Sequence, residues 1–162
     1  MKKQLLILCL VLLHQGLMSQ PVSDTIKVND SLELVRLSPS VWLHISAAEM
    51  PGFGRVSANG IVYVNGNEAF LFDTPWTDGL TKDLIVWLKD KMGIKIVGFV
   101  PNHWHNDCMG GLACIKSHKI ASYANSLTVS IAIEKKLPVP DHSFRDSIQL
   151  KLGDKIIECY YP

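Results

Sequence analysis

The chain has 162 residues, of which 48% are hydrophobic and 19% charged, and its formal net charge is +1. This length suits a single domain, and the composition is that of a globular protein and excludes a disordered chain. The nearly neutral charge gives no sign of a nucleic-acid partner, because such domains carry a marked excess of lysine and arginine.

The first twenty residues predict a secretory signal peptide. Lys2 and Lys3 form a short basic start, and the segment 5–13 is apolar and uncharged. A membrane anchor is the alternative, but this segment is far shorter than the roughly 20 residues that cross a bilayer. We therefore predict a signal peptide over residues 1–20, with cleavage near Ser19 or Gln20.

Cleavage would leave residues 21–162 as the mature protein, periplasmic or secreted and no longer attached to the membrane. The two lost lysines change the formal net charge from +1 to −1. The mature part keeps an odd number of cysteines, so at least one thiol stays unpaired within the monomer even in an oxidising compartment. These cysteines are Cys108, Cys114 and Cys159.

The first part of the mature chain predicts two antiparallel hairpins. Residues 21–30 are polar and predict a short, loosely held lead-in. Alternating apolar residues predict a first hairpin that pairs 32–37 with 41–45. A second hairpin pairs 61–64 with 69–72 across an Asn-Gly-Asn turn, because an Asn-Gly pair favours a tight turn with positive φ.

Between these hairpins, the segment 47–60 predicts a mobile loop. It contains one proline and three glycines around Met50 and Phe53. In one interpretation the loop exposes these apolar side chains at its tip. In the other it is a solvated turn, and Phe53 packs back onto the core.

The rest of the chain alternates helices with strands. Thr77 or Asp78 can cap a helix whose apolar residues recur at spacings of three and four and which ends at Gly93. The almost continuously apolar segment 94–100 predicts a strand buried on both faces. This alternation predicts a layered α/β fold. The later segments are expected to be a helix over 109–118, a strand over 119–123, a helix over 126–136 and a final hairpin of 144–152 with 156–161.

The buried strand is followed by His103-Trp104-His105-Asn106-Asp107, which predicts a metal site. His103 and His105 are two residues apart, so in an extended segment both imidazoles project to the same side. Asp107 can reach that side as the chain turns into a helix. Two imidazoles and a carboxylate suit zinc or another borderline first-row ion better than calcium or magnesium, which prefer oxygen ligands only.

The position of this motif favours a metal site over two surface histidines, because α/β sheets bind ligands at the carboxyl ends of their strands. Gly110 and Gly111 would let the backbone approach closely just after the ligands. We expect Trp104 and Asn106 to serve packing and helix entry. Cys108 could be a further soft ligand, although its side chain need not face the ion that Asp107 faces.

The segment from Pro101 to Gly111 resembles the zinc-binding signature of the metallo-β-lactamases, in particular of the class B subclass that pairs a three-histidine site with an Asp-Cys-His site. Thioesterases of the same fold share His-x-His-x-Asp, but they usually have another histidine where this chain has Cys108. The similarity extends over essentially the whole mature chain, through Phe72-Asp73-Thr74-Pro75, Ser122-Tyr123-Ala124-Asn125, Leu137-Pro138-Val139-Pro140 and Glu158-Cys159-Tyr160-Tyr161.

The resemblance implies the αββα sandwich fold of that family, with a mixed β-sheet covered by helices. It also implies two zinc ions per complete enzyme, with His103 and His105 on the first and Asp107, which we also assign as catalytic, on the second. Asp73 would support the ligands from behind. The segment 47–60 would be a flap whose Met50 and Phe53 contact the substrate.

The implied activity is hydrolysis of β-lactam antibiotics, namely penicillins, cephalosporins and carbapenems, which confers antibiotic resistance. Zinc lowers the pKa of its bound water to about 7, so no covalent enzyme intermediate is needed. The family's other three zinc ligands would lie beyond Pro162, and we interpret His118 and His142 as surface residues that do not replace them. We therefore expect this chain to be the N-terminal half of the domain, inactive without the missing C-terminal half. The alternatives are a non-catalytic zinc-binding remnant and a thioesterase or other ester hydrolase of the same fold.

Overall fold

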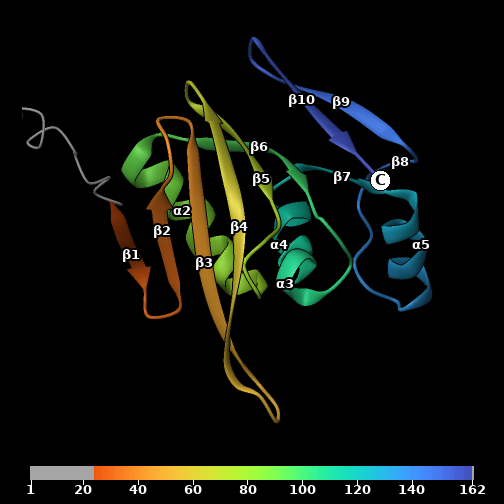
Figure 1. Cartoon of the computed structure of the whole chain (residues 1–162), viewed down its shortest axis with the longest axis horizontal. Coiled ribbons are helices and arrows are strands. Elements are labelled where there is room, and N and C mark those ends of the chain that lie inside the picture. Colours follow the sequence, from red (N-terminus) through yellow and green to blue (C-terminus); the bar gives the residue numbers. More distant parts are fainter. Residues whose placement is uncertain (1–23, 162) are drawn as a thin grey trace, which may run out of the picture.

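The computed structural model describes residues 24–161 and shows a mixed β-sheet with helices on one face and a separate hairpin on the other (Figure 1). Eight strands form the main sheet, in the order of the chain, and two form the hairpin. The strands are β1 (Thr25–Asn29), β2 (Leu32–Arg36), β3 (Val41–Met50), β4 (Gly54–Asn65), β5 (Glu68–Phe72), β6 (Lys95–Val100), β7 (Ala121–Asn125), β8 (His142–Phe144), β9 (Ser147–Leu152) and β10 (Lys155–Tyr160). The helices are α2 (Asp78–Met92), α3 (Asn106–Met109), α4 (Leu112–Ser117) and α5 (Ser126–Glu134).

The direction of pairing changes in the middle of the main sheet. Strands β1 to β5 are joined by hairpins and pair antiparallel, whereas β5 to β8 pair parallel. Parallel neighbours need a crossover, and helices α2 to α5 lie in these connections. As a result, the carboxyl ends of β5, β6 and β7 meet at one edge, where the predicted metal site begins. The predicted α/β architecture is confirmed.

Helix α2 begins and ends where the sequence predicts. The Thr77 hydroxyl accepts a hydrogen bond from the Leu80 amide, as an N-cap residue does. Gly93 adopts a left-handed conformation with φ of 66° and ends the helix. The apolar side of the helix packs against the sheet through Leu84 and Leu88, both fully buried.

Two predictions about connections are wrong. Residues 25–29 form strand β1 and not a loose lead-in, because Ile26 and Val28 pack against the core; residues 21–23 lie outside the described part. The segment 47–60 is not a loop. Strands β3 and β4 continue through it and leave a turn over 51–53, which positive-φ glycines on either side of Phe53 make tight. The result is a long hairpin that projects beyond the sheet (Figure 1).

The two faces of the sheet carry separate apolar clusters. On β5, Leu71 belongs to the larger cluster, which the helices cover, while Phe70 belongs to a smaller cluster with Leu150 and Leu152 of the β9–β10 hairpin. This alternation follows from the twofold repeat of a strand. The described residues 24–161 contain no helix that is long and apolar enough to span a membrane.

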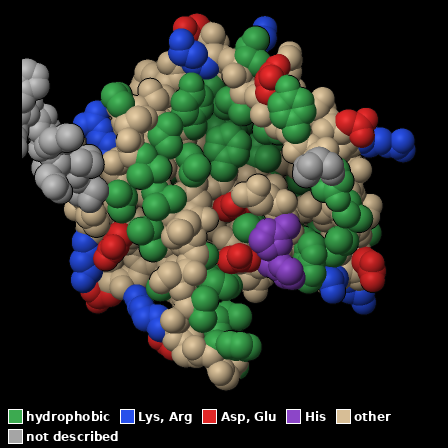
Figure 2. Space-filling view, in the orientation of Figure 1, with side chains coloured by type: hydrophobic (Ala, Val, Ile, Leu, Met, Phe, Trp, Pro, Cys, Tyr) green, Lys and Arg blue, Asp and Glu red, His purple; other side chains and the backbone are tan. Residues whose placement is uncertain are grey.

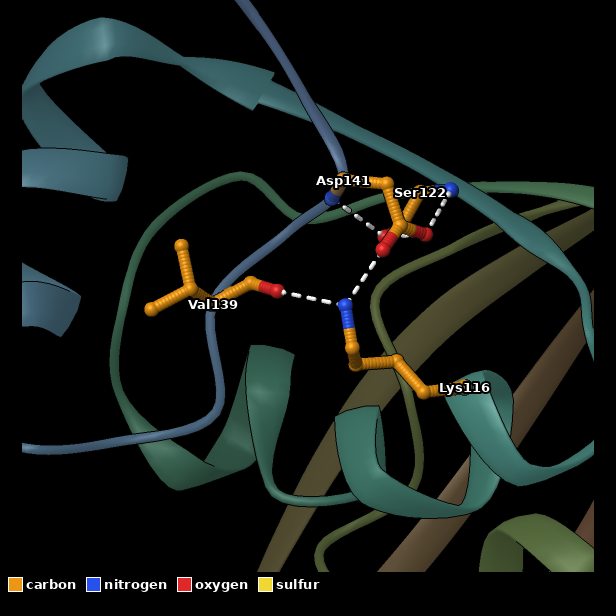
Figure 3. Close-up of polar contacts among 4 residues, drawn as sticks. All are labelled: Lys116, Ser122, Val139 and Asp141. Atoms are coloured by element: carbon orange, nitrogen blue, oxygen red, sulfur yellow. Dashed lines mark hydrogen bonds and ion pairs between the residues drawn. The ribbon is translucent and has the colours of Figure 1, made fainter.

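A polar network connects the end of α4 to the segment before β8 (Figure 3). The Lys116 ammonium donates to the carboxylate of Asp141 and to the Val139 carbonyl, 3.0 Å away. The same carboxylate accepts from the hydroxyl of the buried Ser122 at 2.8 Å, and the Asp141 amide donates back to that hydroxyl at 2.9 Å. The segment that follows α5 is thereby held against β7.

Candidate metal centre

The predicted metal-binding residues lie on one segment at the carboxyl end of β6. We call residues 101–108, which connect β6 to the first turn of α3, the metal loop. Three donor atoms gather on it, from His103, Asp107 and Cys108, all within 4.8 Å of one another. His103 Nε2 lies 3.5 Å from Asp107 Oδ1, and His103 Nδ1 lies 3.2 Å from Cys108 Sγ.

His105 lies beside this group and not within it. Its ring centroid is 4.8 Å from that of His103, and it is also 3.9 Å from the ring of Trp104. Trp104 packs against the larger apolar cluster, as predicted for a packing residue. The two histidines are therefore neighbours, as their spacing predicts, with His105 exposed and His103 half-buried.

Asp73 lies under the metal loop, directly after β5. Its carboxylate accepts two hydrogen bonds from Asn102, one from the backbone amide and one from the side-chain amide, both of 2.7 Å. The Cys108 thiol lies close enough to this carboxylate to lower the pKa of Asp73. Burial raises the pKa of the Asp73 carboxyl, while the Asn102 amides oppose that shift. The supporting role of Asp73 toward metal ligands stays a prediction, and these contacts place its carboxylate where that role would need it.

The side chain of Cys108 faces His103. The sequence alone did not decide this orientation. Burial raises the pKa of this thiol strongly, and the nearby carboxylates of Asp73 and Asp107 raise it further. Without a metal the side chain is therefore a neutral thiol. A divalent cation would reverse this electrostatic situation, since its charge stabilises a thiolate and metal binding releases the proton.

The chemistry of this donor set fits zinc. Imidazole, carboxylate and thiol are the side chains that zinc accepts, whereas calcium and magnesium prefer oxygen ligands only. Asp73 and Asp107 both lie near the buried Cys108 thiol, and their negative charge favours binding of a cation at this point. Within the described residues, no other group of three such side chains gathers in this way.

Two glycines that follow the metal loop let the chain pack closely against neighbouring segments. A Cβ atom on Gly110 would lie 2.1 Å from the Trp76 carbonyl oxygen, and one on Gly111 would lie 1.9 Å from the Thr81 hydroxyl. The Gly111 amide also donates to the Thr74 hydroxyl at 2.9 Å. The close approach predicted for Gly110 and Gly111 is confirmed, and it presses the turn between α3 and α4 onto α2.

The remaining candidate residues lie at the surface. Phe53, at the tip of the β3–β4 hairpin, is 82% exposed, so the interpretation in which it packs onto the core is wrong. Met50, at the end of β3, is half-buried. His118 and His142 are exposed, as predicted.

A cavity of about 230 Å³ borders the metal loop on the face of the sheet that carries the β9–β10 hairpin. It lies at the carboxyl end of β6, where the sequence predicts a ligand crevice. On this side the apolar side chains form a broad band, and histidine and acidic side chains border it (Figure 2). The cavity is lined by Pro101 and Asn102 of the loop together with Phe72, Val100, Asn125, Phe144, Glu158, Cys159, Tyr160 and Tyr161.

Comparison with known proteins identifies relatives of this arrangement. The chain is 39% identical to the metallo-beta-lactamase type 2 of Bacteroides fragilis over 159 residues, which cover 98% of this chain and 63% of that protein. This chain resembles the metallo-β-lactamases over almost its whole length. The metallo-beta-lactamase type 2 of Pseudomonas aeruginosa is 31% identical over 131 residues, which cover 81% of this chain and 52% of the relative. No family model matches the chain.

Solved metallo-β-lactamase structures have the same fold. DIM-1 metallo-β-lactamase superposes with a TM-score of 0.73 at 32% identity, over 81% of this chain and 59% of its own. The enzyme from Pontibacter korlensis gives 0.74 at 28% identity, over 80% and 60%. The chain thus spans between about half and two thirds of the length of these relatives, and the predicted fold class is confirmed.

The sequence did not single out two residues that contact Asp73, Asn102 in the metal loop and His44 in β3. Asn102 provides both amide donors to Asp73, and its place directly before His103 was the only available signal. The buried His44 of β3 contacts Asp73 from the other side, 29 residues away in the chain, and strand periodicity alone marks it only as an inward-facing residue.

Proposed function

We propose that this chain carries the metal-binding part of a zinc-dependent β-lactamase, which opens the lactam ring of penicillins, cephalosporins and carbapenems. The convergence of His103, Asp107 and Cys108 at the carboxyl end of β6 is the observation that carries the proposal. The names of the curated relatives support the same chemistry. The signal pattern of residues 1–20, which lies outside the described residues, supports export to the periplasm or the medium.

In this proposal the complete enzyme holds two zinc ions. His103 and His105 bind the first, Asp107 binds the second, and the other ligands come from the part of the family's domain that this chain does not span. Zinc supplies Lewis-acid activation of water, whose pKa it lowers to about 7. Asp73 orients the metal loop through its hydrogen bonds to Asn102, and the tip of the β3–β4 hairpin covers the substrate with Phe53.

The proposal is tested by completing the domain. Joined to the C-terminal part of the Bacteroides fragilis relative and supplied with zinc, the chain is expected to hydrolyse nitrocefin. The variant His103→Ala should remove this turnover, whereas His142→Ala, an exposed histidine outside the metal loop, should not. A folded, zinc-loaded protein that opens no β-lactam would overturn the substrate proposal.

A second candidate function is metal binding without catalysis by the 162-residue chain itself. The three donor atoms within 4.8 Å favour it, because this part of the site needs no further segment to assemble. The purified chain is then expected to take up Co²⁺, as seen by visible absorption, and to hydrolyse no nitrocefin. Turnover by the chain alone that disappears in His103→Ala would contradict this second function.

Export has a separate test. In a Gram-negative host, the protein recovered from the periplasm is expected to begin near residue 21. A cytoplasmic protein that retains Met1 would contradict the export proposal and leave the metal site untouched.

A further inference from the structure

His44 is a fully buried histidine in the middle of β3. It shares the inward face of that strand with Trp42 and Ser46. Its Nε2 atom lies 2.9 Å from the carbonyl oxygen of Asp73. A carbonyl oxygen only accepts, so Nε2 carries the hydrogen and the ring is in one defined tautomer, with Nδ1 bare.

The ring of His44 reaches across a whole strand to make this bond. His44 belongs to β3, Asp73 follows β5, and β4 runs between them. Neighbouring strands are about 4.8 Å apart, so the donor must cross the backbone of β4. Gly60 makes this possible, because a Cβ atom there would lie 2.1 Å from His44 Nε2.

The residue that receives this bond is held in an unusual conformation. Asp73 has a φ of 59°, in the left-handed region that residues with a side chain adopt only with backbone strain. The Asp73 amide donates to the Val100 carbonyl at 3.1 Å, and His44 binds the Asp73 carbonyl. Both sides of the Asp73 backbone are thus fixed, which leaves the carboxylate aimed at Asn102 and the Cys108 thiol.

We propose that His44 is a positioning residue of the metal centre, which holds Asp73 in the conformation that orients the Asn102 peptide and the Cys108 thiol at the two ends of the metal loop. His44 touches neither metal nor substrate, so it acts through Asp73. This proposal rests on one part of the proposed function, metal binding by the metal loop. It does not depend on which substrate the enzyme hydrolyses. The hydrogen-bond path itself exists in the metal-free chain.

The matched variants are His44→Gln and His44→Leu. Glutamine keeps an N–H donor at the end of a side chain of similar reach, whereas leucine fills much of the space and removes the donor. Val62→Ala is the control, since it weakens the buried core on β4 without touching Asp73.

The first measurement is hydrogen exchange in the metal-free full chain. The Asn102 amide, which donates to Asp73, is compared with the Leu71 amide in the core. His44→Leu should accelerate exchange at Asn102 at least tenfold more than at Leu71, His44→Gln should restore most of the protection, and Val62→Ala should change both amides alike. Equal acceleration of both amides in His44→Leu, or no recovery in His44→Gln, would overturn the proposal.

The second measurement is Co²⁺ affinity by visible absorption. His44→Leu should weaken binding 10- to 100-fold, the range for groups that orient metal ligands, and His44→Gln much less. If the unsubstituted chain bound no Co²⁺, the metal function would fail, while the exchange experiment would still decide the role of His44.

A third measurement covers the case in which His44→Leu does not fold. A long-range proton–nitrogen spectrum of the unsubstituted chain at pH 7 should then show a protonated Nε2 and a bare Nδ1 on His44. The opposite tautomer would overturn the proposal.

Discussion

At the scale of single residues, the metal loop combines groups that the sequence marks with groups that it hides. His103 and Asp107 stand in a recognisable motif, and the structure places Nε2 of the first 3.5 Å from Oδ1 of the second. Cys108 could not be assigned from the sequence, because only the turn from the loop into α3 decides which way its thiol points. His44 could not be found at all, because its partner is 29 residues away.

Buried His44 predicts a pH dependence of stability. Burial lowers the pKa of His44 to about 4, against an ordinary value of 6.5. Between these values the unfolded chain binds a proton that the folded chain does not, so stability falls as the pH falls. We expect His44 to account for a loss of about 2 kcal/mol in the free energy of unfolding from pH 7 to pH 5.

Urea denaturation at the two pH values measures this loss. His44→Gln serves as the reference, because glutamine does not titrate. The variant should lose less stability than the unsubstituted chain over this interval. An identical pH dependence in both proteins would show that His44 is not the group responsible.

At the scale of elements, close backbone contacts decide how the helices meet the metal loop. A Cβ atom on Gly110 would meet two carbonyl oxygens, those of Trp76 and Asn106, at 2.1 and 2.5 Å. Backbone atoms cannot move aside as the end of a side chain can. The Gly-Gly pair was noticed in the sequence, but the sequence does not say which element approaches it.

Gly110→Ala is therefore expected to destabilise the protein by about 1–3 kcal/mol, the usual cost of overpacking a buried site. Gly79→Ala is the matched control. It lies in the first turn of α2, where a new Cβ would meet only the Thr77 hydroxyl, at 3.8 Å. This control should gain about 0.5–1 kcal/mol, because alanine favours a helix more than glycine does. Chemical denaturation distinguishes the two, and equal effects would refute the steric explanation.

The network in Figure 3 predicts which of two variants, Ser122→Ala or Lys116→Met, loses more stability. Ser122→Ala removes a buried hydroxyl and leaves the Asp141 amide without its acceptor, which should cost about 1–3 kcal/mol. Lys116→Met removes a half-exposed ion pair and an exposed hydrogen bond to the Val139 carbonyl, which together should cost about 1 kcal/mol or less. Urea titration at pH 7 measures both. A larger loss for Lys116→Met would show that the ion pair, and not the buried hydroxyl, holds the segment before β8.

At the scale of the whole molecule, the metal loop lies between two exposed features. One is the β3–β4 hairpin, which projects beyond the sheet and ends in Phe53 (Figure 1). The other is the apolar band on the face of the sheet that carries the β9–β10 hairpin (Figure 2). It lies near the cavity lined by the β10 residues Cys159 and Tyr160. In the proposed function, the tip of the β3–β4 hairpin would cover a substrate bound at the metal loop.

Phe53→Ser tests the role of this hairpin in the completed enzyme. The side chain is 82% exposed, so its loss should change the free energy of unfolding by no more than about 0.5 kcal/mol. The KM for a β-lactam should rise roughly tenfold, since losing an apolar contact of about 1.4 kcal/mol weakens binding by that factor. Leu37→Ser, at another exposed apolar residue, is the control, and its KM should not change. Equal KM values in both variants would show that Phe53 does not contact the substrate.

The sequence by itself determined the features that depend on neighbouring residues. Helix α2 with its caps, the alternating strands and the His-x-His-x-Asp motif all depend on spacings of a few residues, so the pattern contains them. The tight turn before Gly54 escaped prediction because long strands continued through a glycine-rich segment whose composition favours a loop. Strand β1 escaped because its pairing partner, and not its polarity, orders it.

The tertiary structure alone decided the surroundings of the metal loop. The path from His44 across Gly60 to Asp73 joins β3 and β4 to the residue that follows β5, and its length depends on strand order and register. Cys108 faces His103 because of the way the chain turns from the metal loop into α3. Such contacts depend on how distant segments pack in three dimensions, whereas a local sequence pattern records only which side chains are available.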